Sequence, residues 1–169
     1  MTGITIRQYH PADLEPGRAL WVELTQRHRE IYNDPTIGGD TPGLYFDKHL
    51  ARVGSEHIWV AEHNGEVVGL VGLIVNDREA EVEPIVVAAA HRDRGIGQDL
   101  LSRMVEEAKK LGVRYLSVKP VARNVEAISF CYDFGFRTLG GIEMFMELEA
   151  QAPGTWKPGQ KLFGHSFQY

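Results

Sequence analysis

Residues 86–104 read VVAAAHRDRGIGQDLLSRM, and this stretch decides the fold. It predicts a strand that ends near Val87, a basic turn with two glycines, and a helix that begins at once. The first N–H groups of a helix have no partner within the helix, and the helix dipole favours an anion there. Gly95 and Gly97 leave the main chain open to close approach, because they carry no Cβ. The stretch therefore predicts a site for phosphate groups.

The two best-known glycine-rich phosphate loops do not match this stretch. A dinucleotide-binding GxGxxG pattern that starts at Gly95 needs glycine where the chain has Leu100, and GxxxxGK followed by Ser or Thr does not occur. Residues 92–97, RDRGIG, match the pattern R/Q-x-x-G-x-G/A and thereby resemble the GNAT superfamily of acyl-CoA-dependent N-acetyltransferases. A nucleotide-binding protein with the same turn is another interpretation, and it predicts equal affinity for ATP or NAD.

A second segment extends the resemblance. Residues 124–136, NVEAISFCYDFGF, are similar to the family's segment N-x-x-A-x-x-F-Y-x-x-x-G-F. The similarity covers residues 81–136 well, and the first half of the chain only through the order of its elements. It implies acetyl-CoA as co-substrate, no metal, and the following residues for binding the coenzyme: Val86, Val87, Arg92, Asp93, Arg94, Gly95, Ile96, Gly97, Gln98, Asn124, Ala127 and Phe130.

The strand before the basic turn carries the candidate general bases. At pH 7 only on the order of one alkylamine in a thousand is neutral, so amide formation needs a base or a desolvated site. Glu81 and Glu83 alternate with Val87 along the strand, which places all three side chains on one face. Pro84 predicts a bulge that would change which glutamate faces the amine, so both stay candidates.

The family resemblance implies two further roles. It assigns the Val87 N–H to the oxyanion that forms on the thioester carbonyl, and a tyrosine four residues before the helix-ending glycine to the general acid. That glycine is Gly135, and the tyrosine position holds Cys131, followed by Tyr132. Both are candidate acids. The function implied is direct transfer of acetyl to a primary amine in a ternary complex, and the alternative is a non-catalytic acyl-CoA sensor of the same fold.

Length and composition limit the class of protein. A chain of 169 residues with 43% hydrophobic residues predicts one domain over residues 1–169. A single cysteine and an N-terminus without a signal-peptide core predict a cytoplasmic protein. The net charge of −5 disfavours nucleic acid or a membrane as partner, and the scattered histidines predict no zinc site. The expected partner is a small-molecule or peptide amine, and the terminal strands also suit a homodimer.

Hydrophobic periodicity predicts the order of the elements. Asn64-Gly65 indicates a tight type I′ hairpin turn. The loop 33–43 is either a plain connection or a mobile lip over the acceptor site, with Asp34, Asp40 and Tyr45 facing an amine. The resemblance implies an α/β fold (α+β) with a mixed sheet of about seven strands, about four helices and one splayed parallel pair of strands. Expected helices cover 14–32, 44–53, 97–111 and 127–134, and expected strands cover 4–9, 57–62, 67–75, 81–87, 115–119, 136–149 and 160–169.

Overall fold

A mixed five-stranded sheet organises the N-terminal part of the computed structural model, which describes residues 3–146, 148 and 156–169. The spatial order of the strands follows their order in the chain. Neighbouring strands are antiparallel except for the last pair, which is parallel. This arrangement confirms the predicted mixed α/β fold, but the sheet has five strands rather than about seven in the described part of the chain. The strands are β1 (Ile4–Gln8), β2 (Ile58–His63), β3 (Glu66–Asn76), β4 (Glu79–Val87) and β5 (Tyr115–Ser117).

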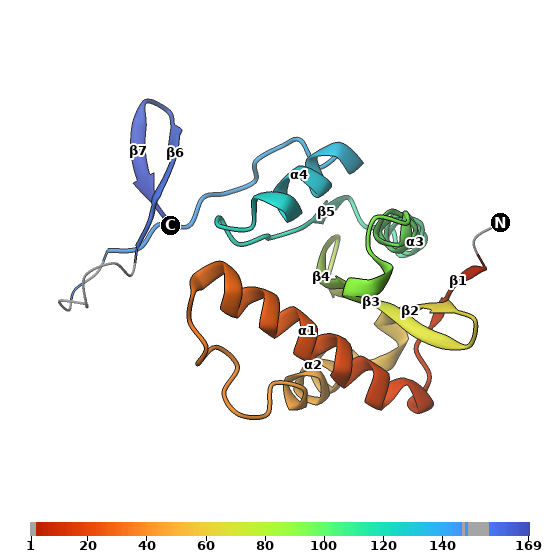
Figure 1. Ribbon diagram of the computed structural model, residues 1–169. Helices are drawn as coiled ribbons and strands as arrows, with labels where there is room; N and C mark the ends of the chain where they lie inside the picture. Colours follow the sequence, from red (N-terminus) through yellow and green to blue (C-terminus); the bar gives the residue numbers. More distant parts are fainter. Residues whose placement is uncertain (1–2, 147, 149–155) are drawn as a thin grey trace. The chain divides into compact units, whose positions relative to one another are not determined.

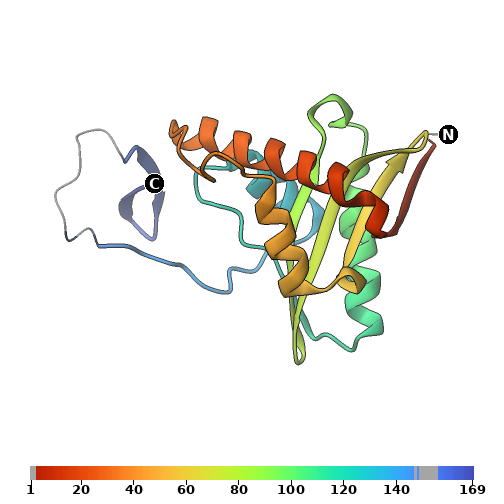
Figure 2. The same ribbon diagram turned by 90° about the horizontal axis from the view of Figure 1, so that it is seen from below.

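Helices cover both faces of this sheet. α1 (Leu14–Tyr32) and α2 (Leu44–Val53) lie on one face and α3 (Ile96–Lys110) lies on the other (Figures 1 and 2). Phe46 of α2 is fully buried between α1 and the strands, and Leu100 and Met104 of α3 are fully buried on the opposite side. Leu111, the last residue of the expected helix 97–111, is 51% exposed and lies one residue beyond the end of α3. Among the described residues, no helix combines the length and apolar character needed to cross a membrane.

The turn between β2 and β3 follows the sequence prediction closely. Asn64 and Gly65 both have positive φ, at 52° and 83°, as a type I′ turn requires. β2 begins at Ile58 rather than His57, since His57 closes a short 3-10 helix, Ser55–His57. The hairpin makes β3 the central strand, and its residues 68–73 are buried against helices on both faces.

β4 contains the predicted bulge and separates from β5 along part of its length, as predicted. The pairing of β3 with β4 shifts by one residue between Val71 and Leu73, which inserts an extra residue of β4 at Glu83 and Pro84. β5 pairs with β4 only from Glu79 to Glu81. Six further residues of β4 therefore have no strand beside them on that edge, among the residues that the structure describes.

The chain divides into two units, residues 1–119 and 120–169. The second unit holds α4 (Val125–Phe134) and a separate hairpin of β6 (Pro158–Leu162) and β7 (His165–Gln168). The predictions of one long strand over 136–149 and of a single strand over 160–169 are wrong in their described parts. Residues 136–146 form no strand, and β6 and β7 pair with each other. Residues 147 and 149 lie outside the described residues, and the single domain over 1–169 stays a prediction.

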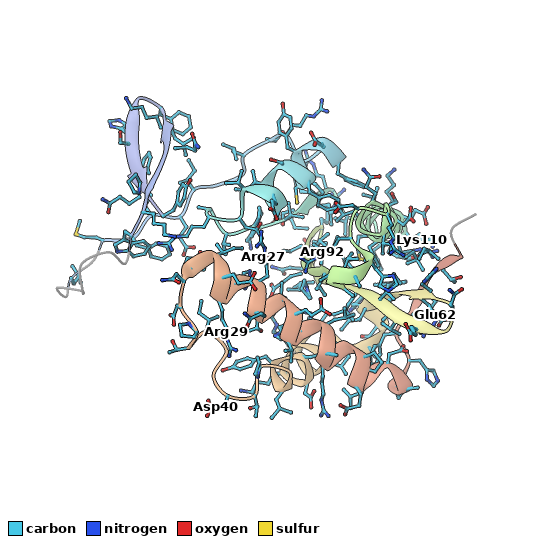
Figure 3. The ribbon with its side chains drawn as sticks, viewed as in Figure 1. Arg27, Arg29, Asp40, Glu62, Arg92 and Lys110 are labelled. Atoms are coloured by element: carbon cyan, nitrogen blue, oxygen red, sulfur yellow. The ribbon has the colours of Figure 1, made fainter. Side chains whose placement is uncertain are left out.

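The loop 33–43 is attached to α1 rather than free. The Arg29 side chain points from α1 toward this loop (Figure 3) and donates hydrogen bonds to the carbonyls of Ile37 (2.8 Å) and Gly39 (2.7 Å). The Asp34 carboxylate accepts from the backbone and hydroxyl of Thr36. Asp34 is therefore occupied within the loop, which favours the plain connection over a mobile lip.

We expect the free energy of unfolding to fall as the pH drops from 7 to 5, because two histidines are kept neutral. Burial lowers the pKa of His28 and of His49, whereas histidines of the unfolded chain titrate near about 6.5. Below that pH the unfolded chain binds more protons than the folded one. Stability therefore rises with pH across this window and is lost on acidification. Urea titrations at pH 7 and pH 5 measure the free energy of unfolding. A pH dependence in His28→Gln equal to that of the parent protein would contradict the role of His28.

Candidate functional site

The turn before α3 presents bare backbone to solvent. Residues 92–95 are exposed, and Asp93 and Gly95 have positive φ, at 60° and 82°. Gly95 is the N-cap of α3 and offers no side chain to the first turn of the helix. Ile96, only 1% exposed, anchors the turn in the core. The result is a fixed helix N-terminus with accessible N–H groups, which suits an anion.

The main chain of Val87 faces the open edge of β4. In an antiparallel pair, hydrogen-bonded and non-hydrogen-bonded residue pairs alternate. Ala88 donates its N–H to the Val68 carbonyl (2.9 Å), so the adjacent pair of Val87 and Gly69 is not hydrogen-bonded. The N–H and carbonyl of Val87 therefore turn away from β3, toward the edge that β5 leaves uncovered. By the same alternation the main chain of Val86 is engaged with β3, and its side chain is 6% exposed in the core.

Two side chains brace the segment that joins β4 to α3. Arg92 is the first residue of the turn (Figure 3), and its Nε donates to the Val87 carbonyl at 3.1 Å. Glu23 of α1 accepts from the Ala89 N–H at 2.8 Å, at the start of a short 3-10 helix, Ala89–His91. Sequence reasoning missed Glu23, because nothing in its local pattern points to a partner 66 residues away.

Glu81 and Glu83 share one face of β4, as predicted, and differ in their partners. Residues 79–87 alternate between buried and more exposed. The extra residue at the bulge nevertheless separates the faces, because Glu81 pairs with Ile74 and Val87 pairs with Gly69, and these two residues of β3 point to opposite faces of the sheet. The Glu81 carboxylate binds Lys119 Nζ and its side chain is 19% exposed. The Glu83 carboxylate binds Arg52 of α2 at 3.0 Å and its side chain is 43% exposed. The prediction that Val87 shares a face with both glutamates is therefore wrong, because the bulge at Glu83 and Pro84 reverses the alternation.

The second unit holds the remaining predicted residues. Asn124 is the N-cap of α4, and its side-chain oxygen accepts from the Ala127 N–H at 3.1 Å. Phe130 is half-buried. Cys131 is buried, and burial raises the pKa of its thiol. Tyr132 is 55% exposed, with the Arg137 guanidinium over its ring.

The residues around the turn fit the diphosphate of CoA. A Cβ on Gly95 would meet no protein atom within 4 Å, so space for a ligand lies directly over the backbone. Arg92 and Arg94 are exposed beside it and add positive charge. Within the described ranges, no three His, Cys, Asp or Glu side chains are grouped to hold a metal ion.

Comparison with known proteins identifies the family. Residues 21–136 match the model of the acetyltransferase (GNAT) family. The chain is 32% identical over 136 residues to N-alpha-acetyltransferase RimI of Mycobacterium tuberculosis, covering 76% of this chain and 84% of that protein. It is 24% identical over 138 residues to the L-methionine sulfoximine/L-methionine sulfone acetyltransferase of Salmonella typhimurium, covering 79% and 80%.

A solved structure of similar fold is the aminoglycoside N-acetyltransferase AAC(6')-Iy in complex with CoA. It aligns with a TM-score of 0.63 at 17% identity, covering 86% of this chain and 95% of that one. The family match spans well over half of the chain, and it includes the splayed strand, the basic turn and α4. The chain therefore belongs to the GNAT family of acetyltransferases and is an acetyl-CoA-dependent acyltransferase.

Proposed function

We propose that this protein transfers acetyl from acetyl-CoA directly to a primary amine while both substrates are bound, with Glu83 as the general base. The observation that carries the proposal is the open edge of β4, where the Val87 N–H faces away from β3 four residues after Glu83. A backbone N–H in that position donates to the negative charge that develops on the thioester carbonyl oxygen.

Spacing along the strand favours Glu83 over Glu81. At about 3.3 Å per residue, Glu83 lies about 13 Å from Val87 along β4 and Glu81 about 20 Å. A proton relay through water spans the shorter separation more readily, because a base must be within hydrogen-bond reach directly or through water. The Glu83 carboxylate is also the more exposed of the two, at 43% against 19%.

The reaction involves three proton movements and releases one proton to solvent overall. Glu83 takes one proton from the ammonium group of the acceptor, which frees the lone pair of its nitrogen. That nitrogen attacks the carbonyl carbon, the N–C bond forms, and the C–S bond breaks with its electron pair on sulfur. Glu83 passes its proton to solvent and then takes the second proton from nitrogen, while the thiolate gains a proton from Tyr132, which solvent reprotonates. A thiolate leaves readily because the pKa of a thiol is only about 8.5.

The acceptor is a primary amine of a small molecule or a peptide. The named relatives act on different acceptors, since one is an N-alpha-acetyltransferase and another acetylates methionine derivatives. A panel of amino acids, peptides with free N-termini or lysines, polyamines and aminoglycosides tests the proposal by the release of free thiol. Acceptor-dependent release is expected. Intact-mass analysis with acetyl-CoA alone is expected to show no acetylated protein, and acetylation of Cys131 would contradict direct transfer.

We expect the thiolate to be protonated with help from Tyr132 more than from Cys131. The phenol of Tyr132 is exposed, whereas the Cys131 thiol is buried at 6% exposure. Tyr132→Phe is expected to lower kcat up to about tenfold, a small effect for general acid catalysis because the leaving group is already good. Cys131→Ala is expected to lower kcat less than Tyr132→Phe does. Steady-state kinetics across the pH range compare the two, and a larger loss of kcat in Cys131→Ala would reverse the assignment.

A further inference from the structure

One polar side chain lies on the buried face of α2. Phe46, His49, Leu50 and Val53 follow the spacing of a buried helical stripe, and His49 is the only polar residue among these four. His49 is 4% exposed. Its ring lies 5.1 Å from the ring of Trp21 of α1, so α1 and α2 hold it in place. A buried imidazole in such a position needs partners for both nitrogens.

The two nitrogens of His49 face different groups. Nδ1 lies 3.3 Å from an Arg52 guanidinium nitrogen, which can only donate, so Nδ1 accepts and the proton is on Nε2. Nε2 is buried and has no hydrogen-bond partner within the described residues. The backbone of Glu83 is close enough to influence the pKa of His49. A buried donor without a hydrogen bond destabilises the fold, so its retention in this place calls for a reason.

Gly72 marks the space between His49 and the bulge of β4. A Cβ built on Gly72 would lie 3.1 Å from His49 Nε2 and 2.4 Å from the Glu83 carbonyl oxygen. Both atoms therefore border the same small volume, which only glycine leaves open. The His49 N–H thus faces the main chain of the residue proposed as general base.

Arg52 completes the contact with Glu83. The same Arg52 nitrogen that bonds His49 also donates to Glu83 Oε1 at 3.0 Å. Glu83 is therefore approached at its carbonyl by His49 and at its carboxylate by Arg52, two residues of one helix turn. Glu81 is held differently, by Lys119, whose side chain is 73% exposed.

We infer that His49 and Arg52 are positioning residues that fix the orientation of the Glu83 carboxylate for proton transfer. The inference rests on the proposed function, because it assigns these residues to the base of that reaction. Their effect on rate comes from orientation, and a misplacement of about 1 Å costs about a hundredfold in rate. His49 is buried and Arg52 acts through the Glu83 carboxylate, so CoA affinity is expected not to depend on them.

A double-mutant cycle tests the inference on the full-length protein. His49→Phe keeps a ring beside Trp21 and removes both nitrogens, and it is expected to lower kcat about tenfold to a hundredfold with the Kd of CoA unchanged. His49→Gln restores a donor and an acceptor, and its kcat is expected within about threefold of the parent value. In a Glu83→Gln background, His49→Phe is expected to lower kcat by less than about twofold, because the orientation no longer matters.

The controls separate the possible failures. Arg103→Ala removes an arginine that is ion-paired on the surface of α3, and its kcat is expected to stay unchanged, whereas Arg52→Ala lowers it. A structural role for His49 predicts the same fold-loss of kcat in both backgrounds and no recovery in His49→Gln, which would overturn the inference. A larger loss of kcat in Glu81→Gln than in Glu83→Gln would also overturn the inference, although acetyl transfer itself would still be observed. Absence of transfer by the parent protein to every amine class would instead overturn the proposed function.

Discussion

Glu83→Gln is expected to lower kcat by about a hundredfold to ten-thousandfold, the usual contribution of a general base. Glutamine has nearly the same shape and no basic oxygen, so acetyl-CoA affinity is expected to stay the same. Steady-state kinetics at saturating acetyl-CoA with the best amine measure the loss. Glu79→Gln provides the matched control, since Glu79 is exposed at the start of the same strand. Its kcat is expected to equal that of the parent.

The pH dependence gives this prediction a second readout. Each unit of pH below the amine's pKa of about 10.4 changes the fraction of neutral amine about tenfold. The loss of kcat in Glu83→Gln is therefore expected to shrink as the pH rises, because free amine then needs no base. A loss that is constant with pH, or a larger loss in Glu81→Gln, would contradict Glu83 as the base.

Gly95→Val is expected to raise the Kd of CoA about tenfold to a hundredfold. Gly95 has a φ of 82°, and a left-handed conformation costs a residue with a Cβ about 1–2 kcal/mol. The added side chain meets no protein atom within 4 Å, so it projects into the space proposed for the diphosphate. Strain and obstruction therefore act together, and titration calorimetry measures the change in Kd.

Gly112→Val separates strain from obstruction. Gly112 has a φ of 71° just beyond the other end of α3, and its Cβ would also meet nothing within 4 Å. The substitution is expected to lower the free energy of unfolding by an amount similar to Gly95→Val, while the Kd of CoA stays the same. Equal loss of CoA affinity in both variants would show that the turn before α3 is not the diphosphate site.

Local signals explain which parts of the fold were predictable. The hairpin follows from Asn64-Gly65, because two positive φ values select those residues. The bulge follows from Pro84, which cannot donate to a strand ladder, and the register shift confirms it. The turn before α3 follows from Gly95. Each of these features depends on residues adjacent in the chain.

The features that sequence reasoning missed depend on distant residues. Arg52 is 31 residues from Glu83, and both glutamates of β4 share one face, so the pattern alone left the base undecided. Residues 136–146 show why a strand pattern can fail. These residues form no strand, because the N–H and carbonyl groups of a strand need a neighbouring strand to pair with, and the pattern does not supply one. Leu139, Met144 and Phe145 therefore remain exposed. A histidine on the otherwise apolar stripe of α2 was the one sequence feature that could have pointed to His49 as a positioning residue.

Calorimetric titration with CoA and with pantetheine, which lacks the diphosphate, tests the central claim most directly. The claim is that backbone amides at the start of α3 bind the diphosphate and direct the thioester along the open edge of β4. The account predicts one CoA bound per chain and a Kd for pantetheine raised at least about a hundredfold, the loss expected when charge-assisted contacts to a helix N-terminus are removed. Equal affinity for the two ligands, or no heat with CoA, would contradict it.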